Sequence, residues 1–378
     1  MSRTASSAAE NHVLAAIGSG RARSRREISQ VLGLSASTVS QHVQSLLTQG
    51  LVEEGDARDS TGGRRAKELR LAGDTELIGV IDLGGAHARL GVVPRGGDLV
   101  RTAEIAITLD DGPRPVLEHC VSELERLAEG APIAGVGIAL PGPVDVASRG
   151  VVSPSRMPGW GGVDIGQILS DIAAVPAVVE NDANAMALGE HFAHSPHPSG
   201  SVTLKAGTAI GSGIVVDGQV YRGAAGAAGD ITHTRVASAR DRQCTCGNRG
   251  CLETVASGAA LVRLLQEEGV DVSSTAEVIA LVRDAHPRAT ALTRAAGHHL
   301  GEVLCAVVNF FNPSAIHLGG ALSSLEPFVS ALRSEVYEGS HPLMTRDLTI
   351  APAALGADAS LVGVSRQVNE HLTGLLRG

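Results

Sequence analysis

The chain has 378 residues, 43% of them hydrophobic, so it is long enough to bury the cores of two or three domains. No apolar run approaches the roughly 20 residues that a membrane span needs, and the N-terminus lacks the apolar core of a secretory signal. We therefore expect a cytoplasmic protein that does not bind membranes and whose cysteines stay reduced.

Charge is distributed unevenly along the chain. Residues 1–75 carry 10 basic and 8 acidic side chains, whereas the remainder carries 21 basic and 32 acidic ones. The basic residues of the first part gather at 21–26 and 62–67. Because an acidic body repels nucleic acid, this distribution indicates that the front segment is the part able to bind it.

Residues 1–74 have the pattern of a winged helix-turn-helix domain, mainly α-helical. Two short helices are expected first, and Ser24 and Gly33 are suited to begin and end the second. A third helix, capped by Ser35 or Ser37 and ended by Gly50, has apolar residues at helical spacing: Val39, Val43, Leu46 and Leu47. Two strands, near residues 51 and 69–71, would then flank a polar wing.

The third helix is the predicted recognition helix in the DNA major groove. Its outward side chains are short or polar enough to reach base edges: Ser37, Thr38, Ser40, Gln41, His42 and Gln44. Arg64 and Arg65 in the wing are suited to phosphates or the minor groove. The alternative is a helical protein-interaction module with a solvated face, but the helices and the wing together favour double-stranded DNA as the partner.

Beyond residue 77 the sequence shows glycine turns after apolar strands. One hairpin turns at Asp82-Leu-Gly-Gly85 and a similar one spans 201–221, which suggests two similar α/β halves. A third glycine turn, at 319–320, follows another apolar strand. Glycine lets backbone amides approach an anion closely, although it also simply closes hairpins.

Between the hairpins, an apolar strand ends in Asn181-Asp182 and a helix is expected to follow. A carboxylate at such a strand end can accept a hydroxyl proton during phosphoryl transfer. Either residue can equally be an ordinary helix N-cap.

Three of the five cysteines, Cys244, Cys246 and Cys251, fall within eight residues. Reducing conditions argue against a disulfide and favour thiolates that hold a soft metal ion. A cluster of buried thiols is the alternative.

The order of these motifs resembles that of the ROK family of repressors and sugar kinases. The motifs that carry the resemblance are DLGG (82–85), PGPVD (141–145), ENDANA (180–185), GTAIGSG (207–213), GAAGDITH (226–233), CTCGNRGCLE (244–253) and HLGGALS (317–323). With the winged helix-turn-helix in front, the chain resembles the transcriptional-regulator branch. The resemblance implies an actin-like ATPase (ribonuclease H-like) body with one α/β subdomain at 75–193 plus 359–378 and a second, zinc-containing one at 194–358.

The resemblance also implies site residues. The sugar would be bound by Asn181, Asp182, Asp230, His233 and Glu253, and Asp182 would be the catalytic base if the protein is a kinase. His233 would join Cys244, Cys246 and Cys251 as the fourth ligand of Zn²⁺. A Cys₃His set leaves no position for water, so this zinc would be structural, not catalytic.

The nucleotide motifs depart from the kinase pattern. The positions that correspond to it are Asp82, Gly84, Gly85, Gly207, Thr208, Gly211, Gly319 and Gly320. Ala86 and His87 stand where the kinases have Thr-Lys, and Ala209 and Ala321 replace glycines. Binding of ATP and Mg²⁺ should therefore be weakened. On the sugar side, Asp230 is one methylene shorter than the family's glutamate, and the usual asparagine is missing from 153–160.

We therefore interpret the chain as a regulator, by default a repressor, that responds to a sugar or sugar phosphate. It would bind a pseudo-palindromic operator as a homo-oligomer, either a dimer or a tetramer. Two alternatives remain: a bifunctional ATP-dependent sugar kinase that also binds DNA, and a constitutive regulator whose sugar site has decayed.

Overall fold

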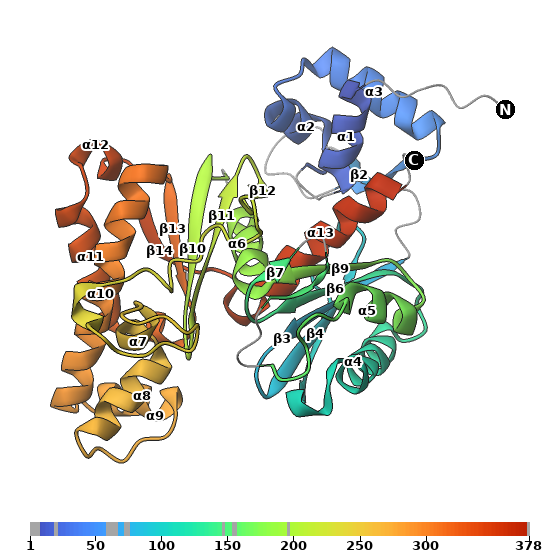
Figure 1. Cartoon of the computed structure of the whole chain (residues 1–378). Coiled ribbons are helices and arrows are strands. Elements are labelled where there is room, and N and C mark those ends of the chain that lie inside the picture. The colour runs from blue at the N-terminus through green and yellow to red at the C-terminus, as the bar shows by residue number, and fades with distance from the viewer. Residues whose placement is uncertain are drawn as a thin grey trace.

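The structure is a computed structural model, and it describes residues 8–18, 22–57, 67–71, 76–145, 148–152, 157–194 and 197–375. Figure 1 shows an N-terminal helical module and two larger α/β parts, each built on its own sheet. In the described ranges, no helix is long and apolar enough to cross a membrane.

The N-terminal module has the predicted helix order and is closed by a two-stranded sheet. Its elements are α1 (Ala8–Gly18), α2 (Arg25–Leu32), α3 (Ala36–Thr48), β1 (Val52–Ala57) and β2 (Lys67–Leu71). The Ser24 hydroxyl accepts a hydrogen bond from the Glu27 amide, and Gly33 ends α2 with a φ of 64°. Ser35, not Ser37, caps α3, and Gly50 follows that helix in the left-handed region. The expected winged helix-turn-helix is confirmed, but Arg64 and Arg65 lie outside the described residues.

The first large sheet has the strand order β5-β4-β3-β6-β9. Its strands are β3 (Leu77–Leu83), β4 (His87–Pro94), β5 (Arg101–Ala106), β6 (Ile133–Leu140) and β9 (Ala177–Asn181). Helices α4 (Pro113–Ala128) and α5 (Ile165–Ala173) cover one face, and the C-terminal helix α13 (Ala359–Leu375) covers the other. The short strands β7 (Val144–Asp145) and β8 (Gly150–Val151) form a separate hairpin.

The second sheet repeats this design with the order β12-β11-β10-β13-β14. Its strands are β10 (Gly200–Ala206), β11 (Ile210–Val216), β12 (Gln219–Val220), β13 (Ala315–Gly319) and β14 (Thr349–Pro352). One face shares a hydrophobic core with the helices between β12 and β14. These helices are α7 (Glu253–Ala256), α8 (Gly258–Glu267), α9 (Thr275–Arg283), α10 (Pro287–Phe311), α11 (Glu326–Gly339) and α12 (Pro342–Thr345). In both sheets an antiparallel hairpin is followed by two parallel strands, as the repeated glycine hairpins predict.

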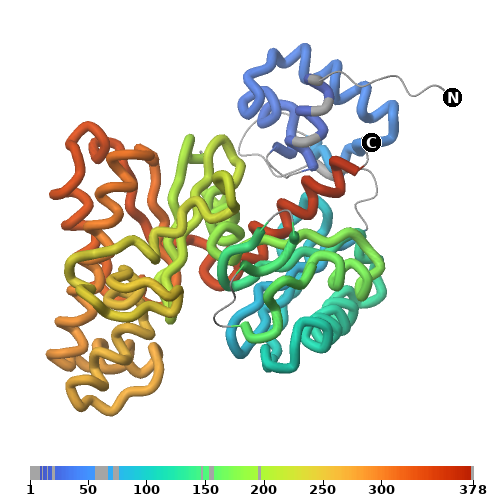
Figure 2. The backbone as a smooth tube through the Cα atoms, viewed as in Figure 1, coloured from blue at the N-terminus to red at the C-terminus, as the bar shows by residue number. Residues whose placement is uncertain are grey.

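Two helices exchange places between the sheets. Helix α6 (Asp182–Ala193) begins directly after β9 of the first sheet but packs on β10 and β11 of the second. Helix α13 follows the last strand of the second sheet but packs on β3 and β6 of the first. In Figures 1 and 2, α13 runs from between the two α/β parts to the N-terminal module.

The helices α6 and α13 cross with their backbones in contact. A Cβ atom at Gly363 would lie 1.7 Å from the carbonyl oxygen of Ala185, and one at Gly189 would lie 2.1 Å from that of Ala359. A backbone carbonyl cannot move away as a flexible side chain can. Both glycines are therefore required by the close approach of the two helices.

We expect Gly363→Ala to destabilise the body strongly, because the new methyl group overlaps a helix carbonyl. The free energy of unfolding should fall by about 1–3 kcal/mol or more, as overpacking of a dense interior does. Gly374→Ala is the matched control, since a Cβ there meets nothing within 4 Å in the same helix. Urea denaturation of both variants measures the difference, and equal stabilities would contradict the crossing.

Candidate functional site

The four predicted metal ligands lie together. One ligand atom from each of His233, Cys244, Cys246 and Cys251 falls within 4.8 Å of all the others. The His233 Nδ1 to Cys244 Sγ distance is 3.6 Å, and the Cys246 to Cys251 Sγ distance is 3.7 Å. Tetrahedral zinc, with bonds of about 2.3 Å to sulfur and 2.0–2.1 Å to nitrogen, needs separations of about 3.6 and 3.8 Å. The donor set and its spacing therefore fit a structural zinc ion.

Backbone bonds within 233–252 hold these ligands in place. The Cys244 amide donates to the Asn248 carbonyl, and an isolated bridge pairs Arg235 with Cys251. Cys244 and Cys251 are buried, whereas His233 and Cys246 are exposed. Burial raises the pKa of the Cys251 thiol to about 12. A divalent cation would hold this sulfur as the thiolate instead, so metal binding would add to the stability of the segment.

Asp182 and Asn181 lie where β9 passes into α6. Asn181 is the N-cap: its Oδ1 accepts bonds from the Ala183 and Asn184 amides, while its Nδ2 donates to the Gly142 carbonyl at 2.8 Å. The amide of Asn181 thus joins the PGPVD loop to the start of α6. The structure therefore shows Asn181 as the helix N-cap. Its expected contact with a sugar hydroxyl stays a prediction.

The structure places a cation against Asp182 that the sequence analysis did not identify. Lys205 Nζ lies 2.6 Å from Asp182 Oδ2, and the Asp182 side chain is 14% exposed. Along β10, Val202, Leu204 and Ala206 are in the core of the second part, so Lys205 lies on the opposite face, toward α6. The signal in the sequence was slight: Lys205 is one of only two lysines and lies two residues before Gly207, where the second glycine turn begins.

Asp82 belongs to the same charged group. The negative charge of Asp182 and then that of Asp82 raise the pKa of Lys205, against the effect of burial. Burial raises the pKa of Asp82 although Lys205 opposes the shift, and the Asp182 charge raises it further. The ammonium group of Lys205 is therefore the ion-pair partner of Asp182, and together with Arg89 it opposes the rise in the pKa of Asp82.

The other predicted sugar ligands gather at the start of β11. Glu253, 7% exposed, accepts a bond from the Ile210 amide at 3.2 Å, and the Thr232 hydroxyl donates to the Ile210 carbonyl. Asp230 is exposed and accepts a bond from the Thr232 amide. A Cβ at Gly211 would lie 3.0 Å from the Cβ of Ala183, so the start of α6 reaches the same end of β11. Sugar binding by these residues stays a prediction.

The three predicted nucleotide turns are formed as glycine turns. Asp82 is the penultimate residue of β3, which ends at Leu83 directly before Gly84 and Gly85, and the Gly84 amide donates to the His87 carbonyl. The carbonyls of Gly207 and Thr208 accept bonds from the Gly258 and Ala259 amides of α8. Gly211 lies on β11, and Gly319 ends β13. Gly320 packs against Ala206, because a Cβ added at Gly320 would lie 2.4 Å from the carbonyl oxygen of Ala206. Nucleotide binding by any of them is untested.

The predicted DNA-contacting residues lie on α3. Ser40, Gln41 and Gln44 are exposed, and His42 is half-buried. The hydroxyls of Ser37 and Thr38 each lie 2.8 Å from that of Ser35 at the start of the helix. The glutamines are thus the longest exposed side chains of this set, and they are long enough to reach base edges.

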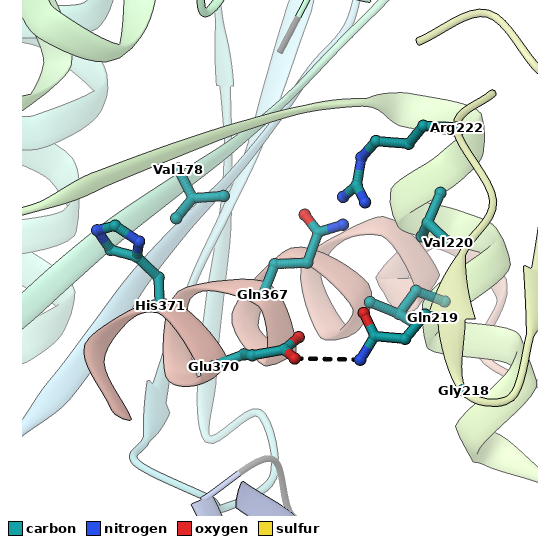
Figure 3. Close-up of a pocket in the computed structure, with 9 residues that line it drawn as sticks. Val178, Gly218, Gln219, Val220, Arg222, Gln367, Glu370 and His371 are labelled. Carbon is teal, nitrogen blue, oxygen red and sulfur yellow. Dashed lines mark hydrogen bonds between the residues drawn. The ribbon is translucent and has the colours of Figure 1, made fainter. Parts of the chain in front are cut away.

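A second network joins the two α/β parts near the C-terminus. The buried Glu180 carboxylate accepts bonds from Arg222, which follows β12, and from Gln367 of α13 at 2.7 Å. Gln219 of β12 donates to Glu370 of α13 at 3.1 Å. These residues surround a cavity of about 270 Å³ (Figure 3), which the sequence analysis also did not identify; its lining residues are Val178, Leu188, Gly218, Gln219, Val220, Arg222, Gln367, Glu370 and His371.

Comparison with known proteins accounts for most of the chain. Residues 78–370 match the ROK family, and residues 7–66 match the MarR family. The chain belongs to the ROK family. It is 29% identical over 367 residues to the xylose repressor of Bacillus spizizenii, covering 94% of this chain and 93% of that one.

Two solved structures resemble this ROK protein. A ROK family transcriptional regulator described as a homolog of E. coli MLC has a TM-score of 0.77 at 24% identity, with 97% of both chains covered. A ROK glucokinase from Streptomyces griseus, solved with glucose and AMPPNP, has a TM-score of 0.66 at 27% identity and covers 78% of this chain and 99% of its own. The first likeness includes the N-terminal module, whereas the second is limited to the body.

We expect the purified protein to carry about one zinc ion per chain, because the four ligands form a closed tetrahedral set. Cys246→Ser should reduce the bound zinc to near zero and lower the melting temperature by at least about 5 °C. Cys305→Ser, outside the cluster, is the control and should keep the metal. Elemental analysis measures the bound zinc, and thermal unfolding measures the melting temperature. A wild-type protein that is purified without zinc and melts at the same temperature as Cys246→Ser would refute the site.

Proposed function

We propose that this ROK protein is a transcriptional repressor that binds operator DNA through α3 and releases it when a sugar binds to the body. The observation that carries the proposal is the course of α13. This helix packs on the first sheet, crosses α6 and contacts α1 of the DNA-binding module. A change in the relation of the two α/β parts therefore has a direct mechanical route to the recognition helix.

The sugar site is proposed at the meeting of α6 and β11. Asp182, Asp230 and Glu253 supply acceptors and His233 supplies a donor, as sugar hydroxyls require. Asn181 would have to exchange one of its bonds to Gly142 and Asp182 for a sugar hydroxyl. The zinc ion would be held by His233 through Nδ1, leaving Nε2 for the sugar or for a neighbouring acceptor. Its contribution would be to fix the segment that carries Asp230 and Glu253.

The proposed coupling follows from linkage between the two binding events. Operator and sugar would favour different arrangements of the two α/β parts, and each would then lower the affinity for the other by the same factor. Glu180, Gln367 and Glu370 hold α13 to residues of both parts, so they are the contacts that such a rearrangement would change. A homodimer would place two copies of α3 on a pseudo-palindromic operator.

The relatives support this function over that of a kinase. The full-length likeness is to a xylose repressor, and the N-terminal module has no place in a simple sugar kinase. The glucokinase likeness keeps phosphorylation as the alternative function. Phosphoryl transfer would require Asp182 to accept a hydroxyl proton, but its carboxylate is ion-paired with Lys205.

We expect a sugar to weaken binding to DNA from upstream of the protein's own gene. Fluorescence anisotropy would measure the affinity with and without D-xylose, D-glucose or N-acetyl-D-glucosamine, and an active sugar should lower it about 5- to 150-fold. Asp182→Asn should abolish this response while the protein still binds the DNA in the absence of sugar. Asp271→Asn, an exposed carboxylate outside the site, is the control. A full response in Asp182→Asn would exclude the proposed sugar site.

We also expect Gln41→Ala and Gln44→Ala each to reduce operator affinity by about 5- to 150-fold, and the double variant to lose more than either, because each glutamine is suited to a bidentate contact with adenine. Binding to unrelated DNA, which depends on phosphate contacts, should change little. Gln30→Ala on α2 is the matched control, being exposed but outside the recognition helix. Equal losses on operator and unrelated DNA would mean that α3 does not read bases.

A further inference from the structure

Lys205 reaches across the boundary between the two α/β parts. It is the penultimate residue of β10, two residues before Gly207, and its ammonium group pairs with Asp182 at the start of α6. Asp82, at the end of β3, is close enough for the charges of the two side chains to affect each other's pKa. A single lysine thus faces two carboxylates that both belong to the first sheet and its following helix.

Two neighbouring carboxylates at a phosphate-type glycine turn are ordinarily a site for a metal ion. Mg²⁺ is bound in nucleotide sites through one or two carboxylates together with phosphate oxygens, and it neutralises the charge of the transferring phosphoryl group. In this chain the Lys205 ammonium group already occupies the Asp182 carboxylate, so a metal ion could bind there only by displacing it. The residues at this position therefore do not fit a magnesium–nucleotide complex.

We propose that Lys205 is a built-in cation that takes the place of a magnesium–nucleotide complex beside Asp182 and Asp82. Asp182 then has a counter-charge that the chain itself supplies, without metal or nucleotide. The role of Lys205 rests on the proposed function, because it accounts for a kinase-like body that binds sugar without nucleotide. It also assigns a physical reason for the loss of phosphoryl transfer that the altered glycine turns alone do not supply.

The geometry separates this role from that of a phosphate ligand. A lysine that binds phosphate presents its ammonium group free toward the ligand, whereas Lys205 is already in contact with Asp182 at 2.6 Å. The negative charge of Asp182 also raises the pKa of Lys205, so the cation remains charged throughout the physiological pH range. Asp182 is held further by the Ala183 amide, which donates to its Oδ1 at 2.8 Å.

The test is a titration with Mn²⁺ alone, a paramagnetic substitute for Mg²⁺, followed by electron paramagnetic resonance on the full-length, zinc-loaded protein. Wild type should show no Mn²⁺ site that depends on Asp182. Lys205→Met leaves two uncompensated carboxylates and should bind one Mn²⁺ at least about tenfold more tightly than wild type. The double variant Lys205→Met with Asp182→Asn should lose that gain.

The chain offers a matched control because Lys67 is its other lysine. Lys67 lies on β2 in the DNA-binding module and pairs with Glu54, so Lys67→Met should leave Mn²⁺ binding as in wild type. Lys205→Arg keeps the positive charge and should also show no gain. If Lys205→Met does not fold, binding of Mg²⁺ with AMPPNP to wild type and to Lys205→Arg decides the question, and neither protein should bind the complex.

Two results would overturn the proposal. One is a wild-type protein that binds Mg²⁺ with AMPPNP and loses this binding in Asp182→Asn. The other is a folded Lys205→Met variant with the same Mn²⁺ affinity as wild type. Neither measurement uses sugar or DNA. Failure of the proposed function would appear in a different experiment, as DNA binding that no sugar changes.

Discussion

The contact of α6 with α13 through bare backbone is the constraint on which the rest of the body depends. Because Gly189 and Gly363 carry no side chains, the two helices approach until carbonyl groups fill the space of a methyl group. One helix starts at Asp182 and the other ends beside α1, so the crossing lies between the candidate sugar site and the DNA-binding module. A densely packed interior changes between discrete arrangements and does not deform continuously. A movement of α6 on sugar binding would therefore shift α13 as a unit.

Around this crossing, charge is placed where the two α/β parts meet. Lys205 pairs with Asp182 at one position, and Arg222 pairs with Glu180 at another. Both cations come from the second part and both carboxylates from the β9–α6 segment. The two cations are about one third exposed and the two carboxylates are mostly buried, so removing either cation leaves a mostly buried carboxylate without its partner. These pairs therefore favour particular relative positions of the parts, and any ligand that changes those positions has to act against them.

Local chemistry explains what the sequence predicted well. Ser24 and Gly33 cap α2 because a hydroxyl acceptor and a left-handed residue are needed at those ends, whatever surrounds the helix. The spacing of the cysteines likewise confines three ligands to one short segment. Lys205 and Arg222 could not be found in this way, since their partners are 23 and 42 residues away and are brought near only by the packing of α6 and β9. Asn181 was recognised as a candidate, but its bond to Gly142 depends on a loop that sequence pattern does not place.

The order of the elements along the chain has a consequence for synthesis, because α13 follows the sheet that it covers. The first sheet presents Ile78, Val80 and Val93 to this helix, and these side chains share a core with Val364 and Val368. A ribosome delivers the N-terminal module and that sheet long before the final helix emerges, and domains generally fold as units in the order of synthesis. Until α13 has been synthesised, the nascent chain therefore has a DNA-binding module beside an incomplete apolar core, and the contact between α13 and α1 cannot yet form.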